Sequence, residues 1–185
     1  MHMEKGQGEK LVPIIENVVA KAGVKISALT AIGVGIGPGN FTGIRIGVAT
    51  ARGLALATGI KAVGVNGFEA LALGTDYPTV SMIKARQGYV YVQSFTDTGA
   101  GTPCLIPLDD IANYCPGLNV TWISTNDKDQ IPRTPHIAKP VFPMAIAIAR
   151  IAAMRWQNDP PRPAPLYLRP PTTTPAQDRG PAILP

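Results

Sequence analysis

Hydrophobic residues in the first half of the chain switch between helical and strand periodicity. From Glu9 to Ala22 the apolar positions recur at helical spacing and stop at Gly23, which predicts an amphipathic helix. The elements predicted next are a strand over 31–35, a helix over about 41–57, a strand over 61–65, and a helix begun by Asn66 and Glu69 as a capping box. Strand, helix and strand in this order predict parallel strands joined by a crossover helix.

The second half has a different pattern. Residues 79–85 and 89–95 alternate around a short polar turn, which predicts an antiparallel hairpin. A short helix over 108–114, a strand over 119–124 and an Ala/Ile-rich helix over 143–157 are predicted after it. Nine of the 26 residues from 160 to 185 are proline, which favours an extended tail. We therefore expect an N-terminal lobe over 1–76, a C-terminal lobe over 77–158 and an extended tail over 159–185.

The predicted helix over 41–57 carries a stripe of small residues. Gly43, Gly47, Ala51 and Ala55 are spaced four apart, so another backbone can approach closely along this line. Apolar residues flank the stripe on both sides, and a helix with so much apolar circumference is buried on two sides. One side can cover the parallel sheet. The other side is explained either by an internal contact with the 9–22 helix or by a helix of another chain.

Composition and charge narrow the classes of function. The 185 residues have a mean hydropathy of +0.12 and contain no apolar run of membrane-spanning length, so a globular, cytoplasmic protein without a membrane segment is expected. Two cysteines, Cys104 and Cys115, and two histidines, His2 and His136, make a metal centre or a hydrolytic triad improbable. The net charge of +5 falls entirely within residues 133–185, a region that could approach RNA or simply be solvated.

The glycine-rich loop before the second helix is a candidate phosphate cradle. Its glycine spacing does not match a dinucleotide fingerprint, and the Lys-Ser/Thr pair of a P-loop is absent. Pro38 also removes one backbone donor. Nucleotide binding by this loop is therefore the weaker interpretation.

The stretch from Gly35 to Ala55 resembles the signature of the bacterial TsaB (YeaZ) family. It begins Gly-Ile-Gly-Pro-Gly-Asn-Phe-Thr-Gly-Ile-Arg-Ile-Gly. Further blocks that resemble the family lie at 8–16, 63–71, 85–91 and 164–169. The resemblance implies an α/β, actin-like/Hsp70-like (ASKHA, RNase H-like) fold of two lobes. The family's opening strand, with its Asp-Thr-Ser loop, and the hairpin after it have no counterpart here. The first lobe is therefore expected to be incomplete, with an unpaired edge on the strand over 31–35.

The resemblance also implies a function. TsaB-like proteins are non-catalytic, cofactor-free partners of a TsaD-type enzyme, which works with a TsaE-type ATPase to place threonylcarbamoyl on the adenosine next to the tRNA anticodon. Their first two helices pack against TsaD or a second TsaB copy. Carried to this chain, the implied interface residues are Leu11, Ile14, Ile15, Val18, Gly43, Ile44, Gly47, Val48 and Ala51. The residues of the signature loop are Gly37, Pro38, Gly39, Phe41, Thr42 and Arg45.

Two other functions remain open from the sequence. The chain could be an ATP-binding enzyme of the same fold, which would bind ATP on its own. It could also be a basic tRNA-binding module, whose affinity would fall steeply with salt. For the preferred interpretation, Gly47→Leu is expected to block association with a TsaD-type subunit while the chain stays folded.

Overall fold

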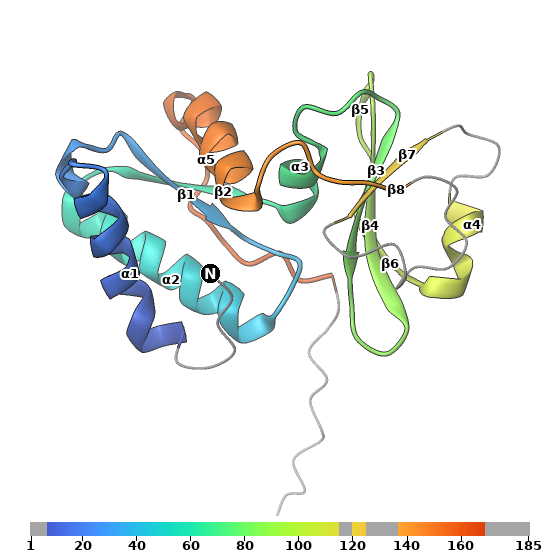
Figure 1. Cartoon of the computed structure of the whole chain (residues 1–185), viewed down its shortest axis with the longest axis horizontal. Coiled ribbons are helices and arrows are strands. Elements are labelled where there is room, and N and C mark those ends of the chain that lie inside the picture. Colours follow the sequence, from blue (N-terminus) through green and yellow to red (C-terminus); the bar gives the residue numbers. More distant parts are fainter. Residues whose placement is uncertain (1–6, 115–119, 125–136, 169–185) are drawn as a thin grey trace, which may run out of the picture.

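In the computed structural model, residues 7–114, 120–124 and 137–168 are described. They form two lobes side by side, with a helix, α3 (Gly67–Ala72), between them (Figure 1). The N-terminal lobe has a two-stranded sheet between layers of helices, and the C-terminal lobe has a six-stranded sheet. His2, Cys115 and His136 lie outside the described residues, as does the part of the predicted tail after residue 168.

The first sheet is the parallel pair that the sequence predicts. Strand β1 (Ala31–Gly35) pairs with β2 (Lys61–Val65) from Ala31↔Lys61 to Gly35↔Val65. The crossover between them is α2 (Phe41–Thr58). Its N-cap is Asn40, whose side chain accepts a hydrogen bond from the Gly43 N–H at 3.0 Å, and it ends at Gly59 with a φ of 74°.

Helices cover both faces of this sheet. On one face α2 packs against β1, and α1 (Gln7–Lys21) lies against α2 on the side away from the sheet (Figure 1). On the other face lies α5 (Met144–Arg155), so close that a Cβ added to Gly33 of β1 would be 2.9 Å from Cβ of Ala152. Chain order groups α5 with the lobe expected over 77–158, yet α5 packs on β1 and β2. A 3₁₀ turn, Ile26–Ala28, precedes β1.

The second sheet is built on the predicted hairpin of β3 (Thr79–Lys84) and β4 (Tyr89–Thr96). The order is β5-β4-β3-β7-β8, with β6 also paired to β4. The remaining elements are β5 (Gly99–Ala100), β6 (Cys104–Pro107), a 3₁₀ turn at Leu108–Asp110, α4 (Ile111–Tyr114), β7 (Thr121–Ser124) and β8 (Ile137–Ala138). Its core includes Val80, Met82 and Trp122. The hairpin is confirmed, whereas β5, β6 and β8 were not predicted.

After α5 and a 3₁₀ turn at Trp156–Asn158, the chain runs back between the lobes. We call residues 159–168 the return segment. Its Leu166 N–H donates to the carbonyl of Ile36 at 2.8 Å, just beyond β1. Leu166 and Leu168 also pack against Phe68 of α3 and Phe95 of β4. The return segment thus contacts both lobes, whereas β1 itself pairs only with β2 among the described residues.

Candidate interaction surface on helices α1 and α2

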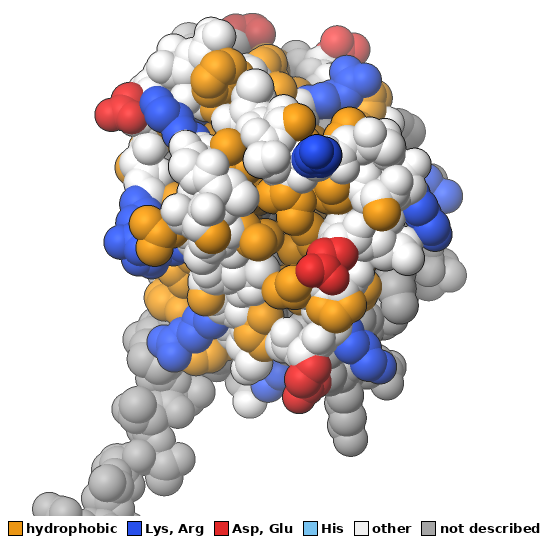
Figure 2. All heavy atoms as spheres, turned by 90° about the vertical axis from the view of Figure 1, so that its left-hand side faces the viewer, with side chains coloured by type: hydrophobic (Ala, Val, Ile, Leu, Met, Phe, Trp, Pro, Cys, Tyr) orange, Lys and Arg blue, Asp and Glu red, His pale blue; other side chains and the backbone are white. Residues whose placement is uncertain are grey.

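Helix α1 presents an apolar face that the rest of the chain covers only in part. Leu11, Ile14 and Ile15 are half-buried, and Val18 is 59% exposed. No residue from Gly8 to Lys21 is fully buried. Figure 2 views the molecule from the side of this lobe and shows hydrophobic side chains gathered at the centre of the face, with charged side chains of both signs around them. A short amphipathic helix is marginal without tertiary packing, so this face favours a further contact.

The predicted contact residues on α2 face a different neighbour. Val48 and Ala51 are 3% and 5% exposed, and they pack with Val34 of β1, together with the half-buried Ile44. A Cβ added to Gly47 would be 3.9 Å from Cγ2 of Val34. Gly43, in the first turn of α2, is half-buried. From Ile44 to Ala51 the predicted residues therefore point to the chain's own sheet, and α1 carries the more open part of the surface.

The signature loop holds the start of α2 in place. Gly37 has a φ of 107°, a conformation that favours glycine, and its carbonyl accepts a hydrogen bond from the Gly67 N–H at 2.7 Å. A Cβ at Gly37 would also lie 2.8 Å from Cδ1 of Ile44. Gly39 and Thr42 are exposed, and Pro38 is half-buried. The loop therefore fastens α2 to α3.

Arg45 and Phe41 of the signature connect α2 to the return segment. Nε of Arg45 donates to the hydroxyl of Tyr167 at 2.8 Å, and the guanidinium carbon lies 3.8 Å from the centroid of the Phe41 ring. The rings of Phe41 and Tyr167 stack with centroids 5.2 Å apart. Sequence reasoning did not predict this contact, because 122 positions separate Arg45 and Tyr167 and no local pattern joins them.

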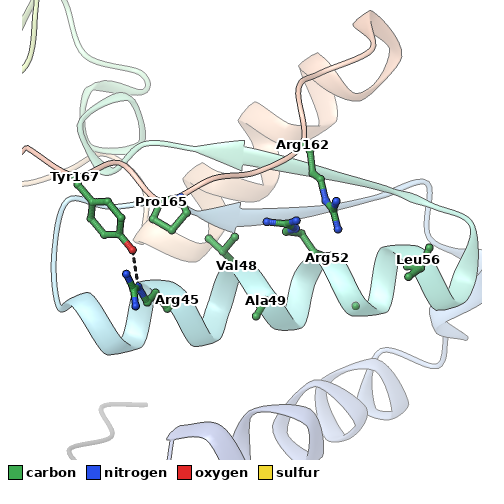
Figure 3. A pocket seen from close by; sticks show the side chains of 9 residues that line it. Arg45, Val48, Ala49, Arg52, Leu56, Arg162, Pro165 and Tyr167 are labelled. Carbon is green, nitrogen blue, oxygen red and sulfur yellow. Dashed lines mark hydrogen bonds between the residues drawn. The ribbon is translucent and has the colours of Figure 1, made fainter.

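A groove along α2 was also missed. It lies between α2 and the return segment, and Arg45, Arg52 and Arg162 are among the residues that line it (Figure 3). The spacing of Arg45 and Arg52, seven apart on one helix, was a visible signal, but the third arginine comes from a segment more than one hundred residues later.

Within residues 7–114, 120–124 and 137–168, no three His, Cys, Asp or Glu side chains come together as a metal site would require. Cys104 is half-buried and makes no disulfide. None of the helices in these ranges is both long and apolar enough to cross a bilayer.

Comparison with protein families and curated proteins gives consistent matches. The family model described as TsaD: tRNA N6-adenosine threonylcarbamoyltransferase matches residues 3–157. A Mycobacterium leprae protein is 30% identical over 183 residues, which are 97% of this chain and 49% of that protein. The chain therefore spans about half the length of this relative. The tRNA threonylcarbamoyladenosine biosynthesis protein TsaB of Escherichia coli is 32% identical over 88 residues, 45% of this chain and 38% of TsaB.

Solved structures show the same fold. YeaZ from Pseudomonas aeruginosa superposes with a TM-score of 0.70 at 24% identity, covering 88% of this chain and 85% of that one. Another solved structure, described as an uncharacterized protein with similarity to peptidase YEAZ from Pseudomonas aeruginosa, gives a TM-score of 0.72 at 24% identity and covers 90% of this chain and 86% of that one. Together with the family-model match, these likenesses confirm the α/β, actin-like fold class that the family resemblance implied.

Proposed function

The chain belongs to the family of TsaD and its TsaB (YeaZ) relatives, and on this premise we propose that it is a TsaB-type subunit in the synthesis of threonylcarbamoyladenosine in tRNA. In this proposal it supplies no acid, base or nucleophile. It binds a TsaD-type subunit through α1 and the adjacent side of α2, and a TsaE-type ATPase joins the complex. A second copy of this chain is the alternative occupant of the same surface.

The open apolar face of α1 is the observation that carries the proposal. Val12 and Val18 are 41% and 59% exposed, and Leu11, Ile14, Ile15 and Val19 are only half-buried although α1 lies against α2. Soluble monomers rarely expose a large contiguous apolar patch, and such a patch marks a protein–protein interaction site. A partner helix that packs along α1 would bury these side chains. Each Å² of apolar surface removed from water would stabilise the complex by roughly 25 cal/mol.

Val18→Glu tests this surface. The variant chain is mixed with the TsaD-type subunit of the same organism, and the complex is measured by size-exclusion chromatography with light scattering. A charge at the centre of the contact is expected to weaken the complex by about thirtyfold or more, equivalent to about 2 kcal/mol. The isolated variant should unfold at the wild-type temperature, because this side chain is mostly exposed in the free chain.

Met154→Glu is the matched control. Met154 is 62% exposed on α5, on the opposite side of the first sheet, so the same type of change is expected to leave the complex intact. Equal affinities of the wild-type chain and Val18→Glu would contradict the proposed surface. Binding of ATP by the isolated chain, measured by calorimetry, would instead favour an ATP-binding enzyme of the same fold.

A further inference from the structure

The groove along α2 is an open surface separate from the face of α1. Its first part lies between α2 and the return segment and has a volume of about 540 Å³. Figure 3 shows the side chains of Arg45, Arg52 and Leu56 rising from α2 on one side, and those of Arg162, Pro165 and Tyr167 coming from the return segment on the other.

A second hollow continues the groove toward the end of α2. It shares Arg52, Leu56 and Arg162 with the first part and reaches Lys61 and Asp159. The two parts therefore form one groove along α2 from Arg45 to the end of the helix. At 1.5 Å per residue, the helix along this groove spans about 20 Å. This length suits an extended chain segment better than a single small molecule.

The charge along the groove is almost entirely positive. Lys61 is paired with Asp159 at 3.1 Å, and Arg45 is held by Tyr167 and Phe41. Arg52 and Arg162 differ from these, because neither forms an ion pair or hydrogen bond with any side chain of the described residues. Two guanidinium groups in one groove, neither paired with a carboxylate of the described residues, are suited to charge-assisted hydrogen bonds with an anionic ligand.

The apolar part of the groove indicates which kind of anion fits. Leu56 is 84% exposed and lies where the two parts of the groove meet, and Ala49 and Pro165 add apolar surface farther along the first part. An apolar side chain of a ligand can cover it. Base stacking is less favoured, because Phe41 and Tyr167 stack on each other and Arg45 lies over Phe41. A peptide with acidic and apolar residues therefore matches this lining better than single-stranded RNA.

We propose that this groove binds an acidic segment of a partner protein, with carboxylates on Arg52 and Arg162 and an apolar side chain on Leu56. The inference goes beyond the proposed function, since it adds a second docking surface that does not depend on α1. A protein bound here would contact α2 and the return segment, which itself contacts both lobes. Helix α1 would remain available to another subunit.

A labelled peptide tests the charge and the apolar contact together. The probe is a fluorescein-labelled peptide of Glu-Glu-Leu repeats, about eight residues long, enough to follow the groove at about 3.3 Å per residue. Binding to the full chain is measured by fluorescence anisotropy. The combination of Arg52→Glu and Arg162→Glu is expected to weaken binding at least tenfold, and replacing leucine by serine in the peptide is expected to weaken it severalfold.

Matched variants distinguish binding of the peptide in the groove from general electrostatic attraction of an acidic peptide to a basic protein. Lys25→Glu with Arg86→Glu changes the net charge equally at exposed positions outside the groove, and should alter the affinity less than about twofold. Arg52→Gln with Arg162→Gln repeats the test without added negative charge if the glutamate pair unfolds.

Equal losses in the groove and control variants would overturn the proposal. So would tRNA affinity that depends on Arg52 and Arg162 while the acidic peptide does not compete, because RNA would then be the ligand. Self-association of the wild-type chain that the same two variants abolish would assign the groove to a second copy. Val18→Glu should leave peptide binding unchanged, so failure at α1 and failure at the groove give different results.

Discussion

The close contact of α5 with β1 gives the sharpest test of the architecture. Gly33 faces α5, and a Cβ added there would lie 2.9 Å from Cβ of Ala152 and 3.1 Å from both Cγ2 and the carbonyl oxygen of Ile148. Ala152 is 3% exposed, and its Cβ is fixed to the helix backbone, so no rotamer change can relieve the contact. Gly33→Ala therefore requires α5 as a whole to shift away from the sheet.

The expected cost follows from overpacking in other cores. Adding a methyl group to a well-packed interior costs about 1–3 kcal/mol. For a chain of 185 residues, each kcal/mol lowers the melting temperature by about 2–4 °C. Gly33→Ala should therefore lower it by about 2–12 °C. The assay is thermal and urea unfolding followed by circular dichroism, with the urea slope compared between variants to verify that the unfolded states are alike.

Gly53→Ala is the matched control for the same substitution. Gly53 lies in the middle of α2, and a Cβ added there meets no atom within 4 Å. Alanine is the better helix residue by about 0.5–1 kcal/mol, so this variant should melt about 1–4 °C higher. If Gly33→Ala also raised the melting temperature, or left it unchanged, α5 would not pack on β1 at this distance and the reasoning would be refuted.

Two further predictions concern α2 and α3. Gly47→Leu should lower the melting temperature of the isolated chain by several degrees, because the added side chain enters the space in front of Val34 on β1. If the melting temperature stayed unchanged and binding to the TsaD-type subunit were lost, Gly47 would face the partner, as the sequence analysis expects. Asn66→Ala should cost about 1 kcal/mol in urea unfolding, because the Asn66 side chain accepts a hydrogen bond from the Glu69 N–H at 2.8 Å; Asn66→Asp, which keeps an acceptor, should cost much less.

Local patterns predicted most of the elements. The alternation around the polar turn predicts the hairpin of β3 and β4, and the capping pair of Asn66 and Glu69 predicts the start of α3. These features depend on neighbours within a few positions, so the information lies in the local sequence. The parallel pairing of β1 and β2 also follows, because a single helix is the only connection between them.

Contacts between distant segments were beyond such reasoning. The Ala/Ile-rich pattern predicts α5 as a helix, but no periodicity indicates that it packs on a strand made more than one hundred residues earlier. The small-residue stripe of α2 allows a close neighbour without identifying it, and in the structure Gly47 faces β1. The sequence likewise does not show why β1 contains Gly33. The reason is the close packing of α5, which leaves no room for a side chain there.

The position of α5 also determines when the first lobe can be completed on the ribosome. Val65 of β2 is fully buried by packing that includes Ala147 and Ile151 of α5. From the end of β2 to the end of α5 the ribosome must add 90 residues, which at about 5–20 residues per second takes about 5–18 s. During that interval the face of the strand pair that α5 later covers exposes its apolar side chains. The nascent chain therefore needs protection from aggregation until almost all of its second lobe has been synthesised.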